Sequence, residues 1–228
     1  MARLARIVVP GLPHHVTQRG NRRQPVFFGQ EDYQAYRELI QHGCERYEVR
    51  VLAYCLMPAH VHLILVPSDE DGLARALGEA HRRYTRRINF REGWRGHLWQ
   101  ERFASFVMDD PYLLAATRYV ERNPVKARLI SRAEDWPWSS AAAHVDGRRK
   151  DPLAEKQWLR DLIADWSCSW REYLAERTDG EMARELSLHE STGRPLGEKS
   201  FVQHLGELLG RDLLPGKPGR PPKQRRAK

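Results

Sequence analysis

The stretch VRVLAYCLMPAHVHLILV, residues 49–66, decides the fold. It consists of two apolar runs separated by Pro58-Ala59, a pattern that predicts two antiparallel strands joined by a tight turn. Alternate side chains of a strand point to the same face, so we expect His60 and His62 to project side by side. The hairpin therefore carries two histidines on one face of a sheet.

Strand and helix patterns alternate on both sides of this hairpin. Strands are predicted over residues 14–19, 49–57, 61–66 and 100–108, and helices over 31–48 and 73–90. A further helix is predicted to begin at Asp109-Asp110-Pro111 and to end at Asn123-Pro124. The order β-α-β-β-α-β predicts an α+β fold, a ferredoxin-like split βαβ with an antiparallel sheet, helices on one face and one added helix.

Changes in apolar spacing and in composition along the sequence divide the chain into three parts. Residues 1–150 are expected to form the domain that contains the sheet, and residues 151–210 a helical extension with apolar spacing around Trp158 and over 201–209. The tail, residues 211–228, holds seven basic residues, one acidic residue and four prolines, and it is predicted to be disordered when free.

The composition favours an anionic partner. The 228 residues include 38 Lys plus Arg against 30 Asp plus Glu, a formal charge of +8, which favours binding of a polyanion without establishing it. The three cysteines fit neither a disulfide framework nor a CxxC metal site. The N-terminus lacks the apolar core of a signal peptide, and no stretch is long enough to span a bilayer, so a cytoplasmic protein is expected.

The chemistry of His60 and His62 admits two interpretations. Two neutral imidazoles on one face form half of a metal site, whereas the simpler alternative is a structural pair in which one ring is hydrogen-bonded. A histidine-triad hydrolase would need a third alternating histidine, and position 64 is Ile. A metallo-β-lactamase-type site would need Asp and His just downstream, where Leu65 and Val66 stand.

Tyr119 and Asn123 form a second candidate pair. They are four residues apart and hence share one face of the predicted helix. A tyrosine that attacks phosphorus must lose its proton and needs nearby positive charge or metal, and the Asn oxygen could complete a site with two histidines. The alternatives are a core tyrosine and an asparagine that ends the helix before Pro124.

Together these motifs resemble a known family. The chain resembles the single-tyrosine transposases of the HUH nuclease superfamily, and within it the group associated with repetitive extragenic palindromes (REPs) of bacterial genomes. The resemblance rests on residues 15–22, 57–62, 98–103, 119–127, 136–140, 193–197 and 219–221, which are spread over most of the length of the chain.

The resemblance implies an activity and its residues. His60, His62 and Asn123 would hold Mg²⁺ or Mn²⁺, although ligand type by itself also admits Zn²⁺. Insertion-sequence relatives usually carry Gln at the position of Asn123. Tyr119 would attack the scissile phosphate, forming a 5′-phosphotyrosine and releasing a 3′-hydroxyl, so that a strand can later be rejoined.

The resemblance also implies the partner, which is single-stranded or hairpin DNA of REP elements. Such a protein would be bacterial, cytoplasmic and nucleoid-associated, and the resemblance favours a monomer over a dimer. Two alternatives stay open: a relaxase or replication initiator of the same superfamily, and a domesticated hairpin-DNA-binding protein that does not cleave. Relaxases and initiators are commonly joined to helicase regions, and no Walker motif occurs in this sequence.

Several basic residues are candidate DNA contacts. Arg82, Arg83 and Arg86 on the second predicted helix could track a DNA backbone, or could be only a solvated basic face. The resemblance puts Arg19, Arg22, Arg23 and Arg102 near the active site, with Lys126 just after the tyrosine motif. Arg220 lies in a Gly-Arg-Pro core that resembles an AT-hook, for which a non-specific basic tail is the alternative.

Overall fold

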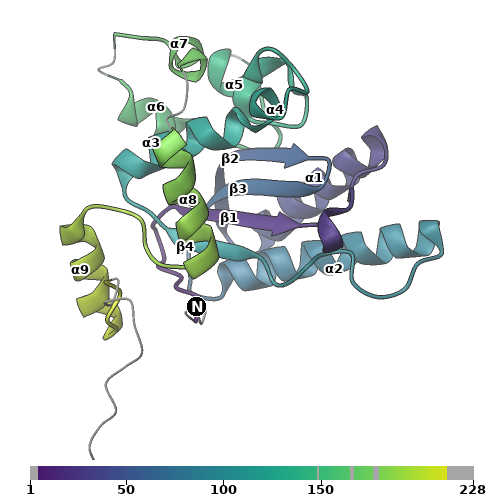
Figure 1. The fold of residues 1–228 in the computed structure, drawn as a ribbon, viewed down its shortest axis with the longest axis horizontal. Helices are drawn as coiled ribbons and strands as arrows, with labels where there is room; N and C mark the ends of the chain where they lie inside the picture. Colours follow the sequence, from purple (N-terminus) through teal and green to yellow (C-terminus); the bar gives the residue numbers. More distant parts are fainter. Residues whose placement is uncertain (1–4, 148, 165–166, 177–179, 215–228) are drawn as a thin grey trace, which may run out of the picture.

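The central element is a four-stranded antiparallel sheet in the order β2-β3-β1-β4 (Figure 1). We analysed a computed structural model that describes residues 5–147, 149–164, 167–176 and 180–214. Strands β2 and β3 form the predicted hairpin, with Met57 paired to His60 around the Pro58-Ala59 turn. The predicted ferredoxin-like arrangement is confirmed, with strands β1 (His14–Arg19), β2 (Val49–Met57), β3 (His60–Pro67) and β4 (Ala104–Val107).

Two hydrophobic layers cover the two faces of this sheet. On one face, Val61 and Leu63 of β3 pack with Tyr36 of α1 (Gln30–Arg46) and Tyr84 of α2 (Gly72–Glu92). On the other face, Ile64 and Val66 pack with Leu113, Ala116 and Val120 of α3 (Asp110–Glu121). The period-two alternation of β3 therefore turns His60 and His62 toward the α3 side. Both faces of the sheet are thus covered by helices, rather than one.

The predicted bounds of most elements differ from the structure by one or two residues, and the start of β4 differs by four. Strand β4 begins at Ala104 instead of Gln100, because Glu101 and Phe103 direct their carbonyl oxygens to the side chains of Gln18 and Arg6 rather than to a strand ladder.

Helix α3 ends at Glu121, before Asn123. Asn123 instead begins a separate short helix, α4 (Asn123–Lys126). Pro124 is tolerated there because the first turn of a helix has no use for its missing N–H. The prediction that Asn123-Pro124 closes the tyrosine helix was therefore wrong by two residues.

The C-terminal region packs onto the α3 side of the sheet. Leu159, Trp170 and Leu186 from this region belong to the same hydrophobic cluster as α3. Helix α8 (Gly180–Thr192) lies beside β4 and β1 (Figure 1). It falls within the predicted helical extension, between the two stretches in which the apolar spacing had indicated helices. The remaining short elements are η1 (Asn21–Arg23), η2 (Ala133–Asp135), α5 (Ala141–Val145), α6 (Gln157–Leu162), α7 (Trp170–Ala175) and α9 (Lys199–Leu209).

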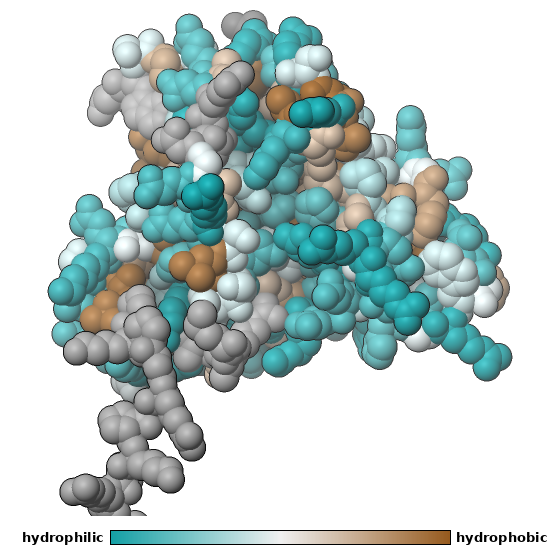
Figure 2. Space-filling view, in the orientation of Figure 1, coloured by the Kyte–Doolittle hydropathy of each residue, from teal (hydrophilic) through white to brown (hydrophobic). Residues whose placement is uncertain are grey.

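The surface seen in Figure 2 is predominantly hydrophilic, with hydrophobic residues in small separate patches. Among the described residues, none of the helices combines the length and the apolar character that crossing a membrane requires. The domain limits at residues 150 and 210 stay a prediction. The predicted disordered tail lies outside the described residues from position 215 onward.

Candidate active site on the histidine face of the sheet

His60 and His62 lie side by side at the start of β3, as their spacing predicts. Their ring centroids are 5.0 Å apart and the rings are nearly perpendicular, at 83°. Burial lowers the pKa of His60 to about 4, assisted by the charge of Arg19. Burial also lowers the pKa of His62 well below its usual value, with neighbouring histidines, Arg19 and Lys126 acting in the same direction. Both imidazoles are therefore neutral at physiological pH, which is the form that can bind a cation.

Tyr119 on the last turn of α3 reaches this pair. The centroid of its ring lies 5.8 Å from that of His62, at an interplanar angle of 87°. Burial and the charge of Glu190 raise the pKa of the Tyr119 phenol, while Arg19 lowers it. The ammonium of Lys126 lies 5.2 Å from the centre of the Tyr119 ring. The structure therefore brings the two sequence-predicted motifs together and adds a positive charge beside the phenol.

Asn123 lies one turn beyond Tyr119 and is buried. Its Nδ2 donates a hydrogen bond to the backbone oxygen of Tyr119 at 2.9 Å, which leaves Oδ1 as the atom that could act as a ligand. Across the described ranges, no group of three His, Cys, Asp or Glu residues is placed to hold a metal ion. Two neutral imidazoles and one amide oxygen nevertheless have the donor chemistry that a divalent cation accepts.

His15 of β1 is a third histidine on the same face, and it was not among the predicted site residues. Its Nε2 lies 3.1 Å from Nδ1 of His62, and the two rings are stacked with centroids 5.3 Å apart and an angle of 7°. Its ring also contacts Tyr119 edge-on, with centroids 6.4 Å apart. The register that pairs Thr17 with His62 brings this ring alongside, and that register cannot be read from either strand by itself.

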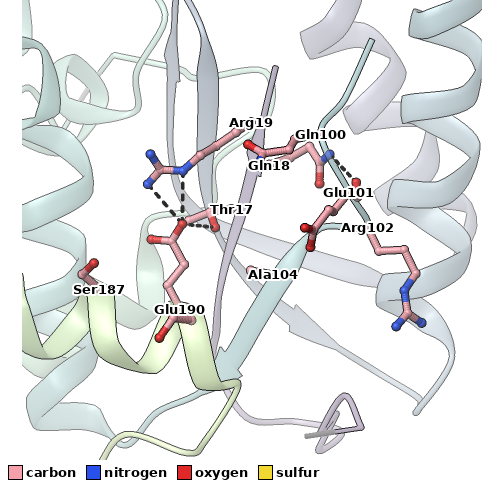
Figure 3. Close-up of a pocket in the computed structure, with 10 residues that line it drawn as sticks. Thr17, Gln18, Arg19, Gln100, Glu101, Arg102, Ala104, Ser187 and Glu190 are labelled. Carbon is pink, nitrogen blue, oxygen red and sulfur yellow. Dashed lines mark hydrogen bonds and ion pairs between the residues drawn. The ribbon is translucent and has the colours of Figure 1, made fainter. Parts of the chain in front are cut away.

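A cavity of about 420 Å³ opens beside the histidines, between β1, the segment before β4, and α8 (Figure 3). At its wall, the carboxylate of Glu190 accepts hydrogen bonds from Thr17 Oγ1 at 2.9 Å and from Arg19 Nη2 at 3.2 Å. Figure 3 shows Arg19 and Thr17 directed toward Glu190, while Arg102 points away from it. Glu190 was missed because nothing in the sequence placed its helix against β1.

The predicted DNA-binding residues fall into separate groups. Arg19 lies at the site, and Lys126 lies against Tyr119. Arg82 and Arg102 line a second hollow of about 570 Å³, which shares residues 100–102 with the cavity beside the histidines.

The remaining predicted basic residues lie farther along the surface. Arg83 and Arg86 line a groove between α1 and α2, on the opposite side of the sheet from the histidines. Arg22 and Arg23 are exposed in η1, where both have positive φ angles of 54° and 60°. Arg220 lies outside the described residues.

A buried carboxylate anchors the end of the tyrosine helix. Glu121, two residues after Tyr119, is fully buried and accepts hydrogen bonds from Ser140 Oγ at 2.6 Å and Trp170 Nε1 at 2.9 Å. Its Oε1 is also 2.5 Å from Nδ1 of His144. These three partners come from the segment before α5, from α7 and from α5, so Glu121 connects α3 to parts of the chain that are distant in sequence.

Comparison with known proteins identifies the family to which this chain is similar. The family model described as "Transposase IS200 like" matches residues 8–123, which include both histidines, Tyr119 and Asn123. A curated Haemophilus influenzae protein, named as a REP-associated tyrosine transposase, is 28% identical over 116 residues. That match covers 46% of this chain and 66% of the relative.

One solved structure shows the same architecture. A REP-associated tyrosine transposase bound to a REP hairpin matches with a TM-score of 0.56 and 21% identity, over 79% of this chain and all of the other. A Deinococcus radiodurans protein described as a transposase is 20% identical over 53% of this chain and 97% of its own. Its TM-score of 0.38 does not establish a shared fold.

Proposed function

The chain belongs to the IS200-like transposase family, and we propose that it nicks and rejoins single-stranded DNA at hairpin repeats with Tyr119 as the nucleophile. The observation that carries the proposal is the position of the Tyr119 ring, 5.8 Å from His62 and beside the cation of Lys126. A phenol in the hydrophobic core would have no need of two neutral imidazoles and an ammonium group around it.

The proposed reaction is a transesterification. The Tyr119 oxygen forms a bond to phosphorus, the bond from phosphorus to the 3′ oxygen breaks, and the phenolic proton is given up while the 3′ oxygen gains one. The product is a 5′-phosphotyrosine, whose bond energy allows a second 3′-hydroxyl to reverse the step. Because the pKa of Tyr119 is raised, the phenol is protonated when free, and the charge of Arg19 favours its anion while Lys126 lies over the ring.

We propose that His60, His62 and Oδ1 of Asn123 hold a divalent cation, Mg²⁺ or Mn²⁺. When bound, it would polarise the scissile phosphate and offset its negative charge. The neutrality of both imidazoles supports this assignment, since a protonated ring cannot act as a ligand. Asn123 would serve a second purpose, because its Nδ2 already ties it to the backbone of Tyr119.

The proposed substrate is hairpin DNA of the REP type. Support comes from the relative whose structure contains a REP hairpin, and from the surplus of eight positive charges on this chain. Arg19 and Arg102 line the cavity between β1 and α8, and Arg102 and Arg82 line the hollow that shares residues 100–102 with it. These three arginines are the proposed contacts to the strand that enters the site.

The deciding experiment incubates the wild type and Tyr119→Phe with a labelled REP hairpin and Mn²⁺. We expect a covalent protein–DNA adduct from the wild type alone, because phenylalanine lacks the attacking oxygen. An equal adduct yield from both would exclude Tyr119 as the nucleophile. Tight hairpin binding without an adduct from the wild type would instead favour a binding protein that does not cleave.

A further inference from the structure

The contact between His15 and His62 joins the two central strands of the sheet at the candidate site. Nε2 of His15 and Nδ1 of His62 are 3.1 Å apart, and their rings are stacked. Both side chains are buried, with 1% of each residue exposed. Phe106 of β4 closes the other side of His15 edge-on, at 5.2 Å between ring centroids. The His15 ring is thus held in one orientation against His62.

This contact determines which nitrogen of His62 carries a hydrogen. Two neutral imidazoles at hydrogen-bond distance share one hydrogen between the facing nitrogens, so one ring donates it and the other accepts it. If His62 donates from Nδ1, its Nε2 has a free lone pair. If His62 accepts at Nδ1, its Nε2 carries the hydrogen, and neither nitrogen of the ring can then bind a cation.

We propose that His15 is a positioning residue for His62: Nε2 of His15 accepts the Nδ1 hydrogen of His62 and keeps Nε2 of His62 unprotonated as a cation ligand. Histidines that bind metal ions generally donate their second ring N–H to a fixed acceptor, which orients the ring and selects its tautomer. In most such sites that acceptor is a carboxylate or a carbonyl oxygen, whereas here it is another imidazole. The inference rests on the proposed cation site.

The surroundings of His15 argue against a role limited to packing. Its other nitrogen, Nδ1, is buried and has no hydrogen-bond partner among the described residues. An apolar side chain of similar volume would fill this position between Phe106 and His62 without an unpaired polar atom. A histidine at this position is therefore unfavourable for stability by itself, and its value lies in what Nε2 does for His62.

The first test reads the tautomer directly in the metal-free protein. Long-range ¹H–¹⁵N correlation of ¹⁵N-histidine-labelled protein distinguishes Nδ1–H from Nε2–H, and His62→Gln identifies the His62 signals. We expect His62 to carry its hydrogen on Nδ1. A hydrogen on Nε2 of His62 would overturn the proposal. This reading needs no metal, so it decides the role of His15 even if the wild type fails to bind Mn²⁺ and the proposed cation site is wrong.

The second test compares two variants of His15 by Mn²⁺ titration followed by electron paramagnetic resonance. His15→Gln puts an amide near the position of Nε2, whereas His15→Leu has similar volume and no acceptor. We expect His15→Leu to bind Mn²⁺ about 10- to 100-fold more weakly, the usual effect of losing the partner of a ligand, and His15→Gln to retain most of the affinity. Equal affinities in His15→Leu and the wild type, or equal losses in both variants, would contradict the proposal.

Thermal unfolding of the same variants separates positioning from packing. His15→Leu removes the buried Nδ1 of His15, which has no partner among the described residues, but it also leaves Nδ1 of His62 without its acceptor. His15→Gln keeps an acceptor for His62, so it is expected to melt close to the wild type and to retain its Mn²⁺ affinity. Equal losses of melting temperature and of Mn²⁺ affinity in His15→Leu and His15→Gln would identify His15 as a packing residue and would reject the positioning role.

Discussion

The pKa of Tyr119 is subject to opposing electrostatic effects. Burial and Glu190 raise its pKa, and Arg19 lowers it, while Lys126 lies against its ring. A free tyrosine already has a pKa of about 10, so the phenol is protonated at neutral pH. The proposed attack of Tyr119 on a phosphate at neutral pH therefore depends on the positive groups around the phenol, which its position between Lys126 and the histidines provides.

Substitution of His60 or His62 tests the proposed cation site directly. His60→Ala or His62→Ala is expected to weaken Mn²⁺ binding at least about 100-fold, because each removes one of only three proposed donors. Isothermal titration of the purified variants measures the change. The matched control is His42→Ala on the exposed surface of α1, which should bind as the wild type does. Retention of full affinity in both site variants would remove the proposed cation site.

Helix α3 is the element that makes the site, because it carries Tyr119 over the histidine face. Its start is fixed by Asp109, whose side chain accepts a hydrogen bond from the Tyr112 N–H. Its end is fixed by Glu121, which receives hydrogen bonds from Ser140 and Trp170 and contacts His144. A helix held at both ends keeps the orientation of Tyr119 constant, which the proposed in-line attack would require.

Removal of the Glu121 carboxylate is expected to destabilise the protein by a measurable amount. Glu121→Ala is expected to lower the free energy of unfolding by about 3–5 kcal/mol, because it leaves the buried ring nitrogens of His144 and Trp170 without their partner. Urea denaturation followed by circular dichroism gives the value. The control is Glu176→Gln, whose exposed carboxylate pairs with Arg118 and should contribute at most about 1 kcal/mol. Similar losses in the two variants would mean that the buried network does not anchor α3.

At the scale of the whole molecule, the free energy of unfolding depends on pH because the protein contains buried, neutral histidines. Burial lowers the pKa of His14 to about 4 and that of His81 to about 3. Their pKa in the unfolded chain is about 6.5, so the unfolded state binds more protons between these values. Stability is therefore fully present above about pH 6.5 and falls as the pH decreases toward the folded-state values.

The expected dependence is steep enough to measure. Each buried histidine contributes up to about 1.4 kcal/mol per pH unit below about pH 6.5. Urea unfolding between pH 7.5 and pH 5 should show this decline, and His81→Gln should make it shallower, since Gln can keep the hydrogen bond to Tyr36 and does not titrate. The wild type, measured over the same pH range, is the reference for this slope. An unaltered slope in His81→Gln would contradict the neutral, buried state of His81.

Much of the molecule follows from local sequence rules. The alternation in residues 49–66 determines the hairpin and puts His60 and His62 on one face, because strand side chains alternate with period two whatever surrounds them. The turn at Pro58-Ala59 and helices α1 and α2 follow in the same way, from residues that are neighbours in sequence. Tyr119 and Asn123 lie one helical turn apart for the same reason, although the helix breaks between them.

Only the tertiary structure decided what meets the histidines. His15 stacks on His62 because β1 and β3 pair in one register, and a shift of one residue would turn that ring to the other face. Glu190 and the partners of Glu121 arrive from segments tens of residues away, through packing of helices that no local pattern orients. Periodicity is a property of neighbours along the chain, whereas a site is a property of neighbours in space. The sequence by itself therefore determined the two histidines and the tyrosine, and the fold determined their surroundings.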